Sequence, residues 1–583
     1  MPTTFKKWSI AVILLVSLAA LFSCGGGGGD PVPVAAGGDP IVPPAGNPPA
    51  GNPPAGNPPP ANLVPANDTF NWTGNTRLTV LAAAGLLAND QAGAVIASAD
   101  TATSQGGAVN VNLATGAFTY DPPPGLQNVA DTFTYRLTGN LQATVTVNLT
   151  ERIWYVRNND TGTNRGNDQA PFITLAQAQN ASDANDTIFV FAGDLAATGQ
   201  NAGITLKPGQ RLLGEGVGLL VNGVPLVDPV PNAVISNAGL APGAAGNIPV
   251  VMLATGNEVA GFSIQAAFNE AILAPGGTGH NLHDNTITFN PANGREGIRL
   301  LAVTGNNFVI ANTITGAPRS GIKLVNNEDQ AGNPVAAVPV AATVTMSRNS
   351  ISSSAQDGIR VSLDGAGTDV TLQIMTNTLT TSGTAGGNGG IDIGSLGAAK
   401  VTAVISRNTV TASTAQAIDL TAAGASILAA LVANNALSGS GGATDFRNAI
   451  AAGGTATSCL ELTSNVNATV NSTFRVDNNP GLAGAFRLFE LGNDTLALRL
   501  AGPITNIVQG GCTIALNGAA LFEANCSRCH KGNGLGQGNV GPDLTSATAL
   551  MITFQLTNNP TMNDIKLTPA EIQAIAAALL PTP

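Results

Sequence analysis

From about residue 67 to residue 150 apolar and polar residues alternate with a period of two, which is the pattern of half-buried β-strands. Within the segment 67–151 the alternation is clearest at 78–81, 109–113 and 143–147, and glycine-containing turn sequences separate these runs. Several short strands joined by tight turns predict a small β-sandwich.

From 152 to 514 two short motifs recur with a period near thirty residues. The first places an aliphatic residue two positions after an asparagine, at Asn285, Asn312, Asn349, Asn377, Asn408 and Asn435. The second places an isoleucine after a small residue, at Gly297, Gly321, Gly358, Gly390 and Ala417. Two short strands per period predict a solenoid, and a parallel β-helix explains both motifs.

Stacked coils of a β-helix lie about 4.8 Å apart, so equivalent side chains form columns. We expect an interior aliphatic column of Ile287, Ile314, Ile351, Leu379 and Val410. The asparagines should form a ladder at a turn, where their amides bond to one another and to the backbone, and where asparagine tolerates a left-handed φ.

Both β segments resemble known families. The segment 152–514, with its first strand at Trp154-Tyr155-Val156 and a capping segment at 171–178, resembles the right-handed parallel β-helix of the pectin-lyase-like family. The segment 67–151 resembles bacterial cadherin-like modules at 85–90, 116–122 and 131–135. These resemblances imply a mainly β protein with an N-terminal sandwich and a right-handed β-helix.

The glycine motif also predicts two outward-facing columns. One contains Arg299, Lys323, Arg360, Asp392 and Asp419, and the other contains Glu296, Ser320, Asp357, Gly389 and Gln416. Polysaccharide lyases of the family need a base with acidic, calcium-holding residues, and hydrolases need paired carboxylates. Here the spacing of Glu296 and Arg299, and of Asp357 and Arg360, indicates local ion pairs on a solvated face. His280, His283 and Asp284 are interpreted as polar groups on a coil edge.

Composition supports cores built from small aliphatic residues, because aromatic residues make up 4% of the chain and charged residues 10%. The net charge is -11, and no basic block occurs outside the N-terminus. Nucleic acid is therefore not an expected partner.

The N-terminus has the pattern of an export signal, with Lys6 and Lys7 followed by an apolar run at 10–21. It ends in Leu21-Phe22-Ser23-Cys24, which resembles a bacterial lipobox. The resemblance implies a signal peptide at 1–23 and a lipidated Cys24, which anchors the protein to the outer membrane or cell surface of a bacterium. Residues 24–66 are rich in glycine and proline and predict a tether.

Near the C-terminus, Cys526-Ser527-Arg528-Cys529-His530 has the Cys-x-x-Cys-His spacing that attaches one haem c through two thiols and places an imidazole on the iron. A short helical run precedes the motif, and Thr568, Pro569 and Glu571 predict a capping box that opens a final helix.

The segment 515–583 resembles a class I cytochrome c, which is a small all-α domain. The resemblance implies Met562 as the sixth iron ligand, with Met551 as a competitor that is expected in the core. Asn563 and Ala578 depart from the family pattern. A haem iron with His530 and Met562 as its ligands is expected to transfer electrons.

With Cys24 assigned to lipid and two cysteines to haem, Cys459 and Cys512 remain, and we expect them to form a disulfide in an oxidising compartment. The main functional hypothesis is a lipid-anchored electron carrier with a redox partner protein in the cell envelope. A polysaccharide lyase or hydrolase and a carbohydrate-binding adhesin, each with an appended cytochrome, are the alternatives.

Overall fold

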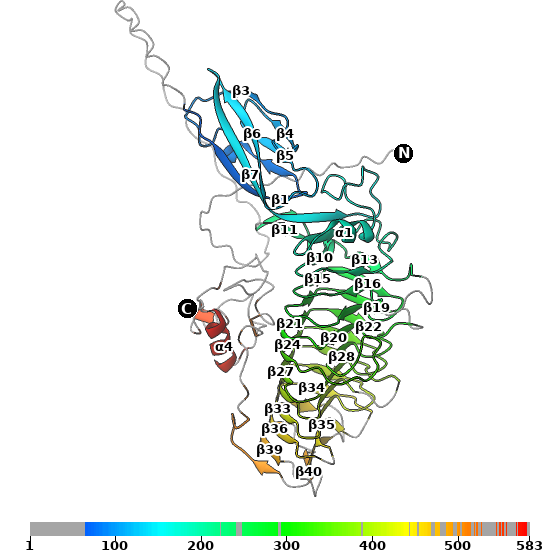
Figure 1. Ribbon diagram of the computed structural model, residues 1–583. Coiled ribbons are helices and arrows are strands. Elements are labelled where there is room, and N and C mark those ends of the chain that lie inside the picture. Colours follow the sequence, from blue (N-terminus) through cyan, green and yellow to red (C-terminus); the bar gives the residue numbers. More distant parts are fainter. Residues whose placement is uncertain are drawn as a thin grey trace, which may run out of the picture.

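The computed structural model describes residues 64–501 apart from 222, 241–247, 290–292, 386–388, 442–443, 452–453, 468–472, 479–484 and 494–497, then 504–512, 514, 518, 521, 522, 526, 544, 547, 549, 551, 552, 556, 567 and 569–579. A β-sandwich lies at one end of a long column of stacked coils, and the C-terminal helix lies beside the column (Figure 1). The expected signal peptide, Cys24 and the tether lie outside the described residues.

The sandwich consists of seven strands among the described residues: β1 (Asp68–Gly74), β2 (Leu78–Val80), β3 (Ile96–Ala99), β4 (Ala108–Val111), β5 (Phe118–Asp121), β6 (Val129–Leu137) and β7 (Leu141–Val156). Strands β2, β5 and β4 form one sheet, and β3, β6, β7 and β1 form the other. Large aromatic side chains fill the space between them, including Trp72, Tyr120 and Tyr135, which are almost fully buried. A 3-10 turn, η1 (Ala82–Ala84), follows β2.

Each regular coil of the solenoid contributes one strand to each of three parallel sheets (Figure 1). The first sheet, called the long sheet here, continues from β7 through β8 (Thr187–Val190), β10 (Arg211–Gly214), β15 (Glu258–Ala260), β18 (Asn281–His283), β21 (Gly305–Ile310), β24 (Ala341–Ser347), β27 (Asp369–Met375), β30 (Lys400–Ser406), β33 (Ile427–Ala433), β36 (Thr457–Thr463), β39 (Ala485–Leu491) and β41 (Thr505–Asn506).

The second sheet has nine strands among the described residues: β13 (Ala233–Ser236), β16 (Phe262–Ala266), β19 (Thr286–Phe289), β22 (Thr313–Thr315), β25 (Ser350–Ser352), β28 (Thr378–Thr380), β31 (Thr409–Thr411), β34 (Ala436–Ser438) and β37 (Val466–Asn467).

In the part of the chain that the structure describes, the third sheet has eleven strands: β9 (Ile204–Thr205), β14 (Val251–Met252), β17 (Ile272–Ala274), β20 (Ile298–Leu301), β23 (Ile322–Val325), β26 (Ile359–Leu363), β29 (Ile391–Ser395), β32 (Ile418–Ala422), β35 (Thr444–Ile450), β38 (Thr473–Asn478) and β40 (Leu498–Ala501). The remaining elements are the hairpin of β11 (Leu219–Val221) and β12 (Val224–Val227), the turn η2 (Glu215–Val217), and the helices α1 (Leu175–Ala181) and α4 (Pro569–Leu579).

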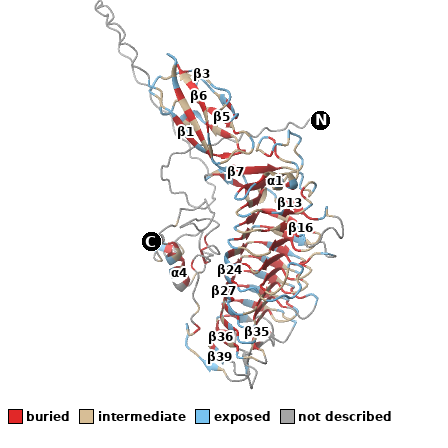
Figure 2. Ribbon diagram, in the orientation of Figure 1, coloured by how far each residue is buried: buried red, intermediate tan, exposed pale blue. Residues whose placement is uncertain are grey.

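The register confirms the expected parallel β-helix, while its right-handed winding stays a prediction. Ile287 pairs with Ile314 and Ile314 with Ile351, and this interior column is fully buried. Buried residues occur in every part of the stacked coils along the length of the β-helix (Figure 2). The expectation of two strands per period was wrong, because the strands of the long sheet lack a short recurring motif. Strand β30, for example, is apolar on both faces at positions 403–405 and does not alternate there.

An asparagine ladder fixes the turn between the long sheet and the nine-stranded sheet. It runs through Asn285, Asn312, Asn349, Asn377, Asn408, Asn435, Asn465 and Asn493. The Nδ2 of Asn377 donates to the Oδ1 of Asn408 (2.9 Å) and to the carbonyl of Met346 (2.9 Å). Its own Oδ1 accepts from the backbone and side-chain N–H groups of Asn349. Asn377 therefore links its own coil to the coil before it and to the coil after it.

The left-handed backbone at this turn does not lie at the ladder asparagines, as the sequence had suggested. It lies one residue earlier, for example at Arg348 (φ 55°), Thr376 (φ 56°) and Arg407 (φ 56°). The preceding residue makes the bend, and the asparagine side chain is then free to point along the column. Non-glycine residues at positive φ are strained, and the ladder bonds stabilise them there.

The sandwich and the β-helix are joined by a shared strand. Strand β7 pairs with β6 and β1 in the sandwich, and its last four residues pair with β8 in the first coil. The core of the sandwich also continues into Tyr155, Phe189 and Leu213 of the first coils. The expected boundary at 151/152 thus falls inside a continuous strand, so the two parts meet through a sheet and a common core.

Replacing one ladder asparagine should destabilise the protein locally. We expect Asn377→Ala to cost about 3 kcal/mol, because it leaves a buried backbone carbonyl and the N–H groups of Asn349 without partners. Thermal unfolding measures this loss, with Thr378→Ala on the exposed side of β28 as the matched control. Equal melting temperatures for the two variants would contradict the role of the ladder.

Candidate functional site

Cys526 is the one described member of the haem motif. Its backbone N–H donates to the carbonyl of Phe522 (2.7 Å), four residues earlier, which is the hydrogen-bond spacing of an α-helical turn. Its side chain is buried in an apolar cluster that includes Leu521, Phe522, Ile552, Ile572, Ile575 and Leu579.

This environment fits a covalently bound haem. A thiol at the edge of an apolar cluster can bond to a vinyl group while the cluster packs against the macrocycle. Cys529, His530 and Met562 lie outside the described residues.

Met551 is 58% exposed, so the expectation that it belongs to the core was wrong. The neighbouring Ile552 takes the buried position of that turn instead.

The expected final helix is α4, and its buried face consists of Ile572, Ile575, Ala576 and Leu579, as the sequence indicated. Glu571 in its first turn forms an ion pair with Arg407 of the β-helix, with 2.5 Å between Oε1 and Nη2. Sequence reasoning gave Glu571 a local capping role and did not find this contact, because nothing local marks Arg407 as its partner.

The outward charged column of the third sheet is aligned as expected, with Arg299 opposite Lys323, Lys323 opposite Arg360, Arg360 opposite Asp392 and Asp392 opposite Asp419. Its first part is not a solvated face, however. Arg299, Glu270 and Glu296 are fully buried.

The ion pairs in this buried part join neighbouring coils. Arg299 pairs with Glu270 (3.2 Å) and with Glu328 (2.9 Å), and it does not form the expected pair with Glu296. Lys323 bridges Glu296 and Glu328. The segment after β23 covers the cluster, and its carbonyls at Asp329 and Gln330 accept hydrogen bonds from Arg299. Burial raises the pKa of Glu270, although Arg295 opposes that shift. The cluster is closed to a polymeric substrate.

The second part of the column is open. Arg360 pairs with Asp357, as expected, and also with Asp392 (2.8 Å) in the next coil. Burial raises the pKa of Asp392 to about 7, against the opposing charge of Arg360 and with the help of the carboxylates of Asp357 and Asp419. Arg447 in turn pairs with Asp419. This open row, in which two carboxylates lie between two arginines, contains an acid that can exchange a proton near neutral pH.

His283 lies between two carboxylates at the end of strand β18 of the long sheet. Its Nε2 is 3.0 Å from Glu258 and its Nδ1 is 2.9 Å from Asp284. Burial alone would lower the pKa of His283, but these two carboxylates outweigh it and raise the pKa to about 9. His280 is buried and bonds to the carbonyl of Gly276, and burial lowers its pKa. His283 therefore forms a charged bridge between Glu258 and Asp284.

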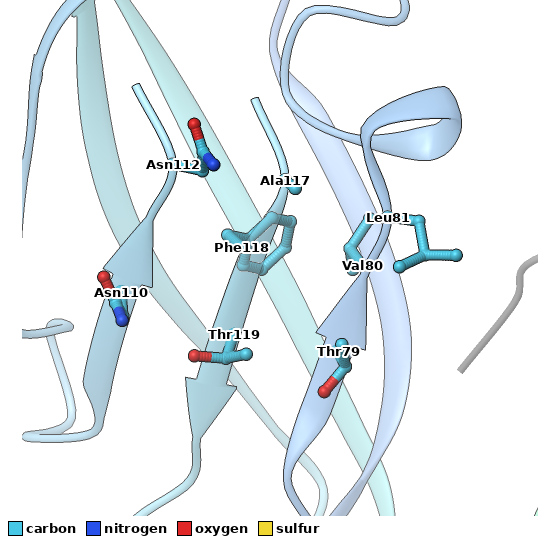
Figure 3. Close-up of a pocket in the computed structure, with 8 residues that line it drawn as sticks. All are labelled: Thr79, Val80, Leu81, Asn110, Asn112, Ala117, Phe118 and Thr119. Carbon is cyan, nitrogen blue, oxygen red and sulfur yellow. The ribbon is translucent and has the colours of Figure 1, made fainter. Parts of the chain in front are cut away.

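A shallow hollow of about 390 Å³ lies on the small sheet of the sandwich (Figure 3). Its lining includes Thr79, Asn110, Asn112, Phe118 and Thr119 and contains no titratable side chain. It offers hydrogen-bonding groups and one ring but no group for acid-base chemistry.

Among the described residues, no three His, Cys, Asp or Glu side chains gather in a way that could hold a metal ion. Within the same residues, no helix is both long and apolar enough to cross a membrane.

Comparison with protein families identifies the C-terminal segment. Residues 514–577 match the family described as cytochrome c oxidase, cbb3-type, subunit III. The chain therefore carries a cytochrome c domain at its C-terminus, which implies haem. No curated protein matches the chain.

Two solved structures resemble the β-helix. One is the pectate lyase Pel9A, with 14% identity over 57% of this chain and 79% of the other, at a TM-score of 0.23. The other is a rhamnogalacturonan lyase, with 13% identity over 67% of this chain and 96% of the other, at a TM-score of 0.28. At these TM-scores neither likeness supports an argument about activity, and the fold assignment rests on the strand register.

The charged bridge predicts a loss of stability at high pH. Folding raises the pKa of His283 from 6.5 to about 9, so its contribution is complete below 6.5 and disappears as the pH rises through about 9. At about 1.4 kcal/mol per pKa unit, the loss is up to about 3 kcal/mol.

Melting temperatures measured between about pH 6 and about pH 10 check this contribution. The wild type should lose more stability over this range than His283→Gln, whereas the control His280→Gln should follow the wild type. Parallel curves for the wild type and His283→Gln would refute the prediction.

Proposed function

We propose that this protein is an exported, lipid-anchored electron carrier of the bacterial cell envelope with one covalent haem c. The single observation that carries the proposal is the Cys-x-x-Cys-His motif at 526–530 inside a segment that matches a cytochrome c family. The buried position of Cys526 in an apolar cluster supports it.

Four residues of this chain would hold the haem: Cys526 and Cys529 through thioether bonds, and His530 and Met562 as iron ligands. When bound, the haem supplies a one-electron centre whose potential the thioether ligand raises. The polypeptide itself shields the site. The apolar cluster around Cys526, which includes Ile572, Ile575 and Leu579 of helix α4, excludes water from that part of the site.

The proposed location follows from the N-terminus. The lipobox-like Leu21-Phe22-Ser23-Cys24 would attach the mature protein to the outer membrane or cell surface, and residues 24–66 would hold the folded part away from the bilayer. Haem is attached outside the cytoplasm, so export and the haem motif agree with each other. The electron donor or acceptor would be a redox partner protein of the cell envelope.

Spectroscopy of the purified chain, matured in a host that attaches haem, tests this function. We expect a visible α-band on reduction that is lost in Cys526→Ser, because that variant lacks one of the two thioether bonds. Ser527→Ala, inside the same motif but without a bonding role, should keep the band. A colourless wild type would rule the proposal out.

A second candidate function is the binding or cleavage of polysaccharide along the open charged row. The raised pKa of Asp392, beside Asp419 and two arginines, favours it, since a general acid near neutral pH is what glycan cleavage requires. The carbohydrate-binding form of this hypothesis needs only the partly exposed side chains of Arg360 and Arg447.

A panel of anionic and neutral polysaccharides tests the second candidate through release of unsaturated sugars or new reducing ends. Asp392→Asn should lower kcat/KM by about 10²- to 10⁴-fold and leave the haem spectrum unchanged. The control Lys400→Ala removes an exposed cation of the long sheet that pairs with Asp369 on the neighbouring strand, away from the open charged row, and it should keep full activity. Inactivity of the wild type across the panel would eliminate cleavage.

A further inference from the structure

The outer face of the long sheet is covered where a bare β-helix would expose it. In β27, β30 and β33 alternate side chains point outward, and on a free solenoid they would meet water. Met375, Val404 and Ser406 occupy such positions, yet they are 1%, 2% and 3% exposed. Thr371 and Thr402, outward-facing on the same strands, are only half-buried. The cover is therefore limited to one part of the face.

The cytochrome domain forms this cover. Met375 and Val404 belong to the same apolar cluster as Leu521, Phe522 and Cys526, and Leu431 of β33 packs against it. Helix α4 lies beside β24 and β27 (Figure 1). At the rim of the contact Arg407 and Glu571 form a two-pronged ion pair, and both side chains are largely shielded from water.

The connection between the two parts is fixed on the same face. Cys459 on β36 forms a disulfide with Cys512, 53 residues later in the sequence. Glu461, two residues further along β36, accepts hydrogen bonds from the backbone N–H groups of Gly510 (3.1 Å) and Cys512 (3.0 Å). From Cys512 to Leu521 only nine residue steps remain, which reach at most about 32 Å when fully extended. The domain starts its path close to the face that it covers.

We propose that the covered part of the outward face of β27, β30 and β33, around Met375, Val404 and Ser406 and here called the seat, holds the cytochrome domain of the same chain permanently. The occupant is a segment of this chain, and three observations identify it: the shared apolar cluster, the ion pair and the fixed connection. The domain is then presented in one orientation relative to the β-helix, and a redox partner must come to it. The seat itself goes beyond the proposed function and does not depend on it, and only the statement about a redox partner rests on that function.

Thiol labelling of the full chain tests the seat. Ser406→Cys places a thiol under the domain with almost no change in volume, and Thr402→Cys places one on the same strand outside the covered part. We expect a maleimide to modify Ser406→Cys about a hundredfold more slowly than Thr402→Cys, because a covered site reacts only when the interface opens. Equal rates at the two positions would overturn the proposal.

Charge reversal separates loss of the seat from a general defect of folding. Adding Arg407→Glu should raise the labelling rate of Ser406→Cys towards that of Thr402→Cys, and adding Glu571→Arg as well should lower it again. Lys400→Glu, a reversal on the same strand away from the seat, should change nothing. Fast labelling in Arg407→Glu that Glu571→Arg does not reverse would contradict the ion pair.

Limited proteolysis of the variants without added cysteines gives a second readout. Arg407→Glu should release the C-terminal fragment faster than the wild type or Lys400→Glu does, and equal release would count against the seat. A colourless protein with a slow-reacting Ser406→Cys would overturn the proposed function and leave the seat intact.

Discussion

The constant register between successive coils is the constraint on which the rest of this structure depends. The asparagine ladder maintains it, because each amide from Asn285 to Asn493 bonds to neighbouring coils and to a buried carbonyl. Once the register is fixed, equivalent sequence positions form straight columns, and successive residues of a column lie about 4.8 Å apart. The buried charged cluster, the open charged row and the seat are all parts of such columns.

The outer faces of the β-helix use this regularity in opposite ways. On the third sheet, Arg299, Lys323 and their carboxylate partners form a largely buried cluster, and removing one partner of an ion pair there is costly because the other stays buried without a counter-charge. On the long sheet, apolar residues such as Met375 and Val404 replace polar ones where the cytochrome domain packs. The outer face of the third sheet thus encloses charged residues, whereas the outer face of the long sheet joins the β-helix to the cytochrome domain.

The sequence predicted the features that depend on short, repeated motifs: the solenoid, the interior isoleucine column, the aligned charges and the face of α4. It did not predict those that depend on contacts between distant segments. Arg299 was expected to pair with Glu296 three residues away, but its partners come from other parts of the chain, at Glu270 and Glu328. The unbroken apolar runs in β30 and β33 were the available signal for the seat, since strands buried on both faces lose their alternation.

The shared strand β7 also determines how the molecule carries a mechanical load. Strand β1 runs parallel to β7, from Asp68 opposite Val145 to Gly74 opposite Arg152, and β7 then enters the β-helix. A pull on the chain before Asp68, resisted at the β-helix, acts along both strands in opposite directions. All the hydrogen bonds between β1 and β7 are then strained together in shear and do not open one at a time. The joint between sandwich and solenoid is therefore strong in the direction in which an N-terminal attachment would pull.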